Sequence, residues 1–293
     1  MSISRLIMIG LLVGLVLAAT QTATAQSGAP EHNAEPVFVL GGLMDEDGTW
    51  DLQFAVDWLA SKKTSMFVGV GKTETDRPQS DLSTNWFNLG LDHAFSDVGV
   101  TAEFEYWGDE DRLTTIDFKG SFYYENDKVY LAALGEVRDI EITFQTLVGE
   151  EVTVNTESSA LGVRIRVRPT QDLLIYATAK DYDYKNSDRT NLILLCFLRP
   201  DICSLNTSPL ILARSFLNYS LSAGFDYQFS KVALNLNLSK VESFLDEQEI
   251  DVISGGLVIP AGTRSDIELI AGLSSAEYDG DIFFGGINIY LYR

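Results

Sequence analysis

Histidine and cysteine are scarce in this sequence. Its 293 residues include only two histidines, His32 and His93, and two cysteines, Cys196 and Cys203. A zinc ion in a protein needs three or four clustered ligands, and these residues form no such cluster along the chain. Acid–base chemistry at neutral pH most often depends on histidine, and only His93 falls inside a predicted strand. We therefore expect no metal site, no cofactor and no enzymatic activity.

Long hydrophobic runs are also absent after residue 25. A membrane-spanning helix needs about 20 consecutive apolar residues, and the most apolar later stretch, Leu192–Leu198, is much shorter. The one longer run, Leu6–Ala19, follows a single early cation, Arg5, and precedes the small residues Ala23-Thr24-Ala25. This order is typical of a secretory signal peptide, which we assign to residues 1–25. The alternative, an uncleaved anchor helix, would call for a longer apolar run.

Basic residues are few relative to acidic ones. The chain has 21 Lys and Arg against 42 Asp and Glu, which gives a net charge of −21. So negative a chain is not expected to bind nucleic acid. The acidic residues gather in predicted loops at Asp45–Asp47, Asp109–Asp111, Glu150–Glu151 and Asp246–Glu249. Divalent cations could join these clusters to lipopolysaccharide phosphates, because hard cations prefer oxygen ligands. The alternative is that they are solvated loop tips.

What the sequence does have is sustained alternation of apolar and polar residues. In the segment 217–229, aromatic and aliphatic residues occupy every second position, and the positions between them carry Asn, Ser, Gly, Asp and Gln. Such alternation predicts β-strands with one apolar face. The same period predicts strands near 37–44, 50–58, 65–72, 87–95, 100–106, 116–124, 129–138, 157–168, 173–184, 232–239, 250–258, 265–276 and 282–292.

The composition of the two faces separates a membrane barrel from a soluble sandwich. The polar face is mostly uncharged, and the apolar face carries aromatic residues near strand ends, such as Trp50, Trp58, Tyr219 and Phe229. Strands of about ten residues with aromatic rims match a barrel that crosses an outer membrane. A secreted β-sandwich or lectin-like domain is the alternative. In lipid every backbone polar group must be paired, and a closed barrel achieves that.

On these features the chain resembles Gram-negative outer-membrane β-barrel proteins over residues 37–293. The signal peptide, the alternating hairpins and the final strand Ile287–Arg293 carry the resemblance, although Arg293 follows the terminal aromatic residue Tyr292. The resemblance implies an all-β, up-and-down antiparallel transmembrane barrel in the cell outer membrane, preceded by a flexible tail at 26–36. It also implies outer-membrane lipid and the barrel-assembly machinery as partners. We prefer 14 strands, and 12 remain possible if 37–44 and 250–258 do not span.

The connections between predicted strands alternate in length. Long ones are expected at 73–84, about 140–156, 185–213 and about 244–250, and with 14 strands they all lie outside the cell. The loop 185–213 is apolar and contains both cysteines, which we expect to pair because exported proteins meet an oxidising compartment. An apolar loop does not stand free in water, so we expect it to fold into the barrel mouth. It could instead bind an apolar ligand, a partner or lipid.

One strand shows the strongest contrast between its two faces. In Leu161–Pro169, three arginines alternate with Val163, Ile165 and Val167. An arginine facing lipid at the membrane midplane costs about 2–4 kcal/mol, so the arginines are expected in the lumen. With charges from neighbouring strands they form the predicted pore lining: Arg164, Arg166, Arg168, Glu103, Glu105, Asp117, Lys119, Glu136 and Arg138. Segregated charge would create a transverse field across the lumen. Alternatively these groups form cross-strand ion pairs that fill the lumen.

The sequence therefore predicts a porin-like channel for passive diffusion of small polar solutes or ions. Barrels of eight strands are filled by side chains, whereas 16–18 strands leave an aqueous channel, so 12 to 14 strands permit either outcome. The alternative function is a plugged barrel that acts as a surface binding, adhesion or structural protein through its long loops. The solute, the oligomeric state and any gating are not specified by these patterns.

Overall fold

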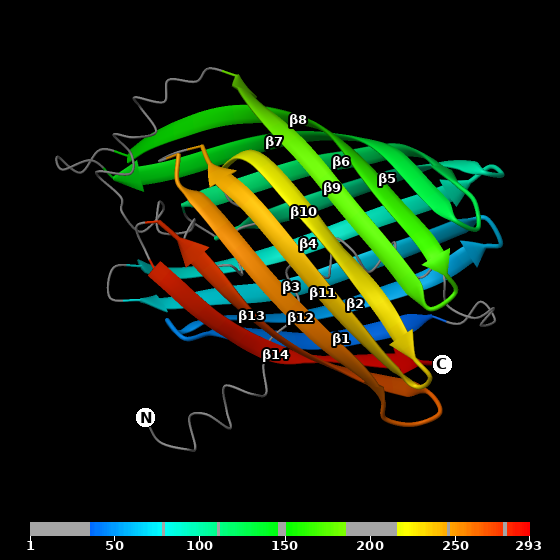
Figure 1. Ribbon diagram of the computed structural model, residues 1–293. Coiled ribbons are helices and arrows are strands. Elements are labelled where there is room, and N and C mark those ends of the chain that lie inside the picture. Colours follow the sequence, from blue (N-terminus) through cyan, green and yellow to red (C-terminus); the bar gives the residue numbers. More distant parts are fainter. Residues whose placement is uncertain are drawn as a thin grey trace, which may run out of the picture.

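The computed structural model of the chain is a single closed barrel of antiparallel strands (Figure 1). It describes residues 36–77, 80–109, 112–145, 151–185, 216–244, 247–277 and 280–293. Each strand pairs with its neighbours in sequence, and the last strand closes the barrel against the first through pairs such as Val37 with Tyr292. No free sheet edge is left in this circuit, which satisfies the requirement for paired backbone groups in lipid.

The fourteen strands follow one another without any other element between their described ends. They are β1 (Val37–Asp45), β2 (Thr49–Ser61), β3 (Thr64–Arg77), β4 (Ser80–Ala94), β5 (Val98–Gly108), β6 (Leu113–Glu125), β7 (Val129–Gln145), β8 (Glu151–Thr170), β9 (Leu173–Lys185), β10 (Leu217–Phe229), β11 (Val232–Ser243), β12 (Glu249–Pro260), β13 (Ser265–Ala276) and β14 (Gly280–Tyr292). The preferred count of 14 is confirmed, because β1 and β12 both belong to the closed circuit. Within the described ranges, no helix is long and apolar enough to cross a membrane.

Two of the predicted long connections are largely strand instead. The ladder between β3 and β4 continues to the pair Arg77 and Ser80, and the ladder between β7 and β8 continues to Gln145 and Glu151. The predicted loops at 73–84 and about 140–156 are therefore wrong in extent. At Lys72–Arg77 both faces of the strand end are polar, so the alternation disappears although the backbone pairing continues. At the end of β7 the alternation persists, with Ile140 and Ile142 on one face, and the predicted strand ended too early.

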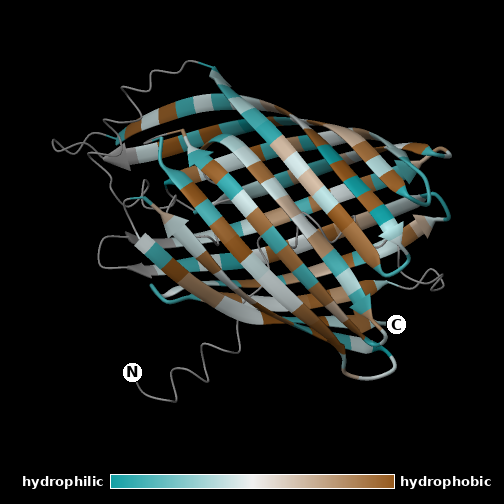
Figure 2. Ribbon diagram, in the orientation of Figure 1, coloured by the Kyte–Doolittle hydropathy of each residue, from teal (hydrophilic) through white to brown (hydrophobic). Residues whose placement is uncertain are grey.

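Hydrophobic and hydrophilic residues alternate along the strands (Figure 2), and their exposure shows that the barrel is apolar outside and polar inside. Large apolar side chains such as Leu161, which is 77% exposed, Phe118 and Phe283 project outward. Inward positions hold buried polar residues such as Arg138 and Asn288. This is the reverse of a soluble protein, and an exposed apolar surface of this extent is stable in hydrocarbon. The fold is that of outer-membrane β-barrels, and the outer face is its membrane surface.

The two ends of the barrel differ in their connections. At one end six short turns join β2 to β3, β4 to β5, β6 to β7, β8 to β9, β10 to β11 and β12 to β13, and both Val37 and Arg293 lie there. Short turns and chain ends mark the periplasmic side of such barrels, so the opposite end is extracellular. The signal peptide, the tail 26–36 except its last residue, most of the loop 185–213 and both cysteines lie outside the described residues. The expected disulfide and mouth-covering loop accordingly stay predictions.

Candidate channel lumen

The charged residues predicted on β5, β6 and β7 meet halfway along the inner wall. Backbone register places Glu103 opposite Lys119 and Lys119 opposite Glu136. In the next row, Glu105 lies opposite Asp117, which lies opposite Arg138. These positions share one face because alternate residues of paired strands point the same way. The sequence therefore identified six side chains that the fold brings together.

These side chains are joined into one network of ion pairs. Arg138 donates from Nε to Asp117 Oδ1 at 2.8 Å, and from Nη2 to Asp117 Oδ2 at 2.9 Å and Glu136 Oε1 at 3.1 Å. Lys119 bonds to Glu105, and its Nζ lies 3.8 Å from Glu103 Oε1. Charges of both signs are thus mutually neutralised within the wall. The cross-strand ion pairs that the sequence left open as an alternative are therefore present, on the inner face of the wall.

Lys180 on β9 completes the network, and the sequence analysis did not single it out. Its Nζ donates to Glu136 Oε2 at 2.8 Å. The signal was present, because Lys180 is on the inward face of the predicted strand 173–184 together with Tyr176 and Tyr182. We call Glu103, Glu105, Asp117, Lys119, Glu136, Arg138 and Lys180 the paired wall.

The three arginines of β8 are arranged differently from one another. The Arg166 side chain is buried, and its guanidinium carbon lies 3.7 Å from the centre of the Tyr130 ring on β7. Arg164 donates from Nε to Thr178 Oγ1 on β9 at 3.2 Å. Arg168 is half-buried next to the periplasmic turn. The aliphatic residues between them, Val163 and Ile165, are exposed on the outer face, so the predicted assignment of the two faces is confirmed.

On the opposite wall, formed by β10–β14, neutral hydrogen-bond donors surround a buried carboxylate. Glu268 on β13 accepts hydrogen bonds of 2.7 Å from Asn235 Nδ2, Asn288 Nδ2 and the Tyr290 hydroxyl. Asp226 on β10 also faces inward. Among the described side chains of these five strands, the only lysine within a strand is Lys240, and it lies on the outer face with Leu238. We call Asn235, Glu268, Asn288 and Tyr290 the amide wall.

Inward-facing aromatic rings lie against the wall and not across the lumen. Trp86 on β4 covers Gly71 of β3, where an added Cβ would stand 2.3 Å from the indole. Tyr176 on β9 covers Gly224 of β10, and an added Cβ there would lie 2.5 Å from its hydroxyl. Glycine at these two positions therefore makes room for a ring to lie flat. The Trp86 Nε1 group also donates to Asp51 Oδ2 on β2 at 3.3 Å, and this hydrogen bond holds the ring against the wall.

Space remains beside the charged side chains in the middle of the lumen. Although they lie halfway along their strands and point inward, the side chains of Glu103, Lys119 and Lys180 are 20%, 17% and 24% exposed. A lumen filled by packed side chains would leave such groups without accessible surface. The network therefore lines a space.

The extracellular end of the inner face contains fully buried apolar residues, which the sequence analysis missed. Leu43, Leu113, Ile142 and Ile250 are at most 1% exposed, and they come from four strands. Ile142 was placed in a predicted loop, and Leu113 fell just outside the predicted strand 116–124, so their face was not examined. Sequence alternation alone could have found them only if the strands had been extended past the membrane. These residues lie among buried polar ones such as Thr49 and Ser243, so the extracellular end of the wall is tightly packed and mixed in polarity.

His93 lies at the periplasmic end of β4, as expected. Its Nδ1 is 2.9 Å from Thr64 Oγ1, and its ring packs edge-on against Phe95 at 4.8 Å. These contacts are those of a polar aromatic residue at a membrane boundary. No carboxylate contact is recorded for it among the described residues that would orient it as a catalytic base.

Comparison with solved structures supports the barrel fold. The chain is similar to a structure titled CymD monoaromatic hydrocarbon channel, with a TM-score of 0.55, 8% sequence identity, and coverage of 97% of this chain and 95% of that one. It also matches the KdgM porin (TM-score 0.42, 9% identity, 87% and 98% coverage) and the NanC porin (0.44, 7%, 89% and 100%). No protein-family model matches the chain. No curated protein sequence matches it either.

Proposed function

We propose that this protein is an outer-membrane channel for passive diffusion of small polar solutes or ions. The observation that carries the proposal is the accessible charge in the middle of the lumen, on Glu103, Lys119 and Lys180. Aromatic side chains that lie flat on the wall, such as Trp86 and Tyr176, support it because they leave the central space free. The membrane-facing exterior supplies the setting that a pore requires.

The paired wall favours polar solutes over hydrocarbons. The solved structure with TM-score 0.55 is titled a hydrocarbon channel, and this lumen does have apolar side chains such as Leu43 and Ile142 in its extracellular wall. Further in, however, a hydrocarbon would displace water from the carboxylates and ammonium groups of the paired wall, at a cost that a polar solute avoids. Polar molecules exchange their hydration for hydrogen bonds with those same groups.

The charge arrangement also predicts selectivity for cations. Among the strand residues whose side chains the structure describes, the inward-facing bases lie on β6–β9: Lys119, Arg138, Arg164, Arg166, Arg168 and Lys180. Inward-facing carboxylates occur on β6–β9 too. They also occur on other strands, where they are Asp57, Asp92, Asp226 and Glu268. Because most bases are already engaged with carboxylates or rings, the remaining lumenal field is negative, and it raises the local cation concentration.

Planar-bilayer recording of the purified, folded protein tests the proposal. We expect discrete conductance steps, and a reversal potential in a KCl gradient that shows preference for potassium. Replacing Arg164, Arg166 and Arg168 together with glutamine should strengthen this preference. Absence of steps from protein that shows barrel circular dichroism and heat-dependent gel mobility would refute the channel. An unchanged reversal potential in the triple variant would remove the arginines from the pore lining.

A further inference from the structure

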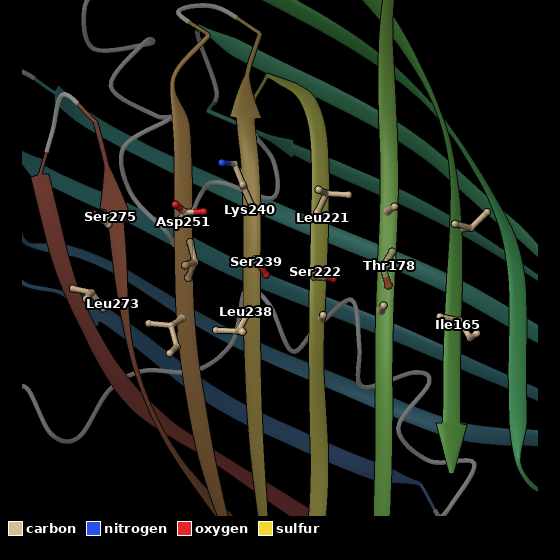
Figure 3. A pocket seen from close by; sticks show the side chains of 16 residues that line it. Ile165, Thr178, Leu221, Ser222, Leu238, Ser239, Lys240, Asp251, Leu273 and Ser275 are labelled. Atoms are coloured by element: carbon tan, nitrogen blue, oxygen red, sulfur yellow. The ribbon is translucent and has the colours of Figure 1, made fainter. Parts of the chain in front are cut away.

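A groove lies on the membrane face of the barrel, outside the lumen. It extends over β8–β13 and has a volume of about 610 Å³ (Figure 3). Its lining includes the small outward residues Ala177, Ala179 and Ala223 on β9 and β10. Larger outward side chains stand on both sides, including Ile165 on β8 and Leu238 on β11. Small residues between larger ones form a depression in the surface, and its volume lies within the roughly 300–1,000 Å³ of ligand pockets.

The register of the strands explains the shape of the groove. One row of paired residues across six strands is entirely apolar: Ile165, Ala177, Ala223, Leu238, Ile253 and Leu273. The adjoining row toward the extracellular end is Val163, Ala179, Leu221, Lys240, Asp251 and Ser275. The second row therefore changes from apolar to charged between β10 and β11. The groove reaches from hydrocarbon to the polar boundary of the membrane.

A basic group stands at the polar edge of this groove. Lys240 and Asp251 lie toward the upper, extracellular end in Figure 3, above Leu238, Leu273 and Ile165. The Lys240 ammonium donates to Glu249 Oε2 at 2.6 Å, and its side chain remains 38% exposed. An ammonium has three donors, so Lys240 can bind a phosphate in addition to Glu249. Asp251 lies opposite Lys240 in the register, and its charge and that of Glu249 limit the gain. Among the described residues that line the groove, Lys240 is the only base.

We propose that the groove binds lipopolysaccharide, with an acyl chain of its lipid A part along the alanine floor and a lipid A phosphate at Lys240. Three features favour this occupant over another protein. The groove faces lipid, its apolar lining continues into the hydrocarbon region, and its one cation lies at the extracellular boundary, where lipid A phosphates are located. Burial of acyl methylene groups supplies affinity and Lys240 selects the phosphate. This site does not depend on whether the lumen conducts.

Native mass spectrometry of the delipidated full-length protein, titrated with lipid A, tests the site. Two variants are compared with the unaltered protein. The double variant Ala177→Leu/Ala223→Leu fills the groove, and Lys240→Ala removes the cation. We expect one bound lipid A on the unaltered protein. Filling the groove should weaken binding about tenfold or more, because the acyl contact is lost. Lys240→Ala should weaken it about twofold to fivefold, as for a partly exposed ion pair.

The barrel offers matched controls on its other side. Lys72 on β3 is also outward and paired with an adjacent acid, Glu74, at 2.5 Å, and Ala102 on β5 is an exposed outward alanine. Lys72→Ala and Ala102→Leu should leave lipid A binding unchanged. Heat-dependent gel mobility confirms that each variant is folded.

Several results would overturn the proposal. Equal binding by all variants would mean that lipid A does not occupy the groove, and equal loss in the controls would mean that it binds the surface without a site. Phosphatidylglycerol binding as tightly as lipid A would assign the groove to phospholipid. A dimer that disappears when Ala177 and Ala223 become leucine would assign it to a second copy of the chain.

Discussion

The two walls of the lumen solve the same electrostatic problem in different ways. On the paired wall, Arg138 is 1% exposed and bridges Asp117 and Glu136 with direct ion pairs. On the amide wall, Glu268 is 4% exposed, and its partners among the described residues are the neutral donors of Asn235, Asn288 and Tyr290. A buried charge needs either an opposite charge or several well-placed hydrogen bonds. The first solution cancels the charge, while the second leaves it in the lumen.

This difference gives the lumen its polarity. Fields from close ion pairs fall off rapidly, because each charge is neutralised by its neighbour. Hydrogen bonds stabilise the charge of Glu268 but do not cancel it, and Asp226 lies near Glu268 on the same side of the barrel. A cation that crosses the lumen is therefore expected to travel closer to the amide wall. The four predictions below test the contrast between the walls.

The largest effect is expected from breaking the paired wall at its centre. Arg138→Met keeps the length of the side chain but leaves Asp117 and Glu136 buried without their cation. Loss of one partner of a buried ion pair costs about 3–5 kcal/mol, because the other charge stays uncompensated. Urea unfolding in lipid vesicles should show this decrease in the free energy of unfolding. A decrease below about 1 kcal/mol, the range of surface pairs, would contradict the network.

A smaller effect is expected from the amide wall. Glu268→Gln removes the charge and replaces one acceptor oxygen by a donor that faces the amide groups of Asn235 or Asn288. The loss of charge-assisted hydrogen bonds should lower stability by about 1–3 kcal/mol. The same unfolding measurement applies, with Gln53 on β2 changed to Glu as a comparison for adding lumenal charge. A stabilised Glu268→Gln variant would show that the uncancelled charge is not accommodated.

The ion selectivity of the pore should change more when a carboxylate is removed from β10 than when one is removed from the paired wall. Asp226→Asn removes a carboxylate that has no recorded ion pair among the described residues, whereas Glu103→Gln removes one that lies 3.8 Å from Lys119. We expect Asp226→Asn to reduce the potassium-to-chloride permeability ratio about twofold to fivefold, an energy below about 1 kcal/mol. Glu103→Gln should change the ratio less. The opposite order, read from reversal potentials, would place the ion path along the paired wall.

The smallest effect is expected from an ion pair outside both walls. Lys185 Nζ lies 2.8 Å from Glu157 Oε2, but the Lys185 side chain is 71% exposed on the outer face. Water screens such a pair, so Lys185→Ala should cause no resolvable change in unfolding or in conductance. A clear loss of stability would mean that this pair is shielded in the membrane environment, and it would weaken the distinction between lumenal and outer pairs.

Much of the architecture was predictable from the sequence because it rests on local periodicity. Alternation in segments such as 217–229 and 161–168 fixed which residues face lipid and which face the lumen, and the assignment of Val163, Ile165 and the arginines between them is confirmed. The strand end at Lys72–Arg77 was not predictable in this way. Both faces are polar there, so the alternating pattern is lost while backbone hydrogen bonds continue the strand. Around Ile142 the alternation persists, and the predicted strand ended too early.

The sequence by itself determined the class of fold and the sidedness of each strand, since a side chain's face follows from its position in its own strand. It left 12 or 14 strands open, and the closed circuit of the tertiary structure decided for 14. Only the tertiary structure decided which charges pair, because register joins residues as distant as Glu136 and Lys180, and Asn235 and Glu268. It also decided that three alanines from two strands form one groove. Partners across strands depend on how many residues each turn takes up, and no local pattern records that number.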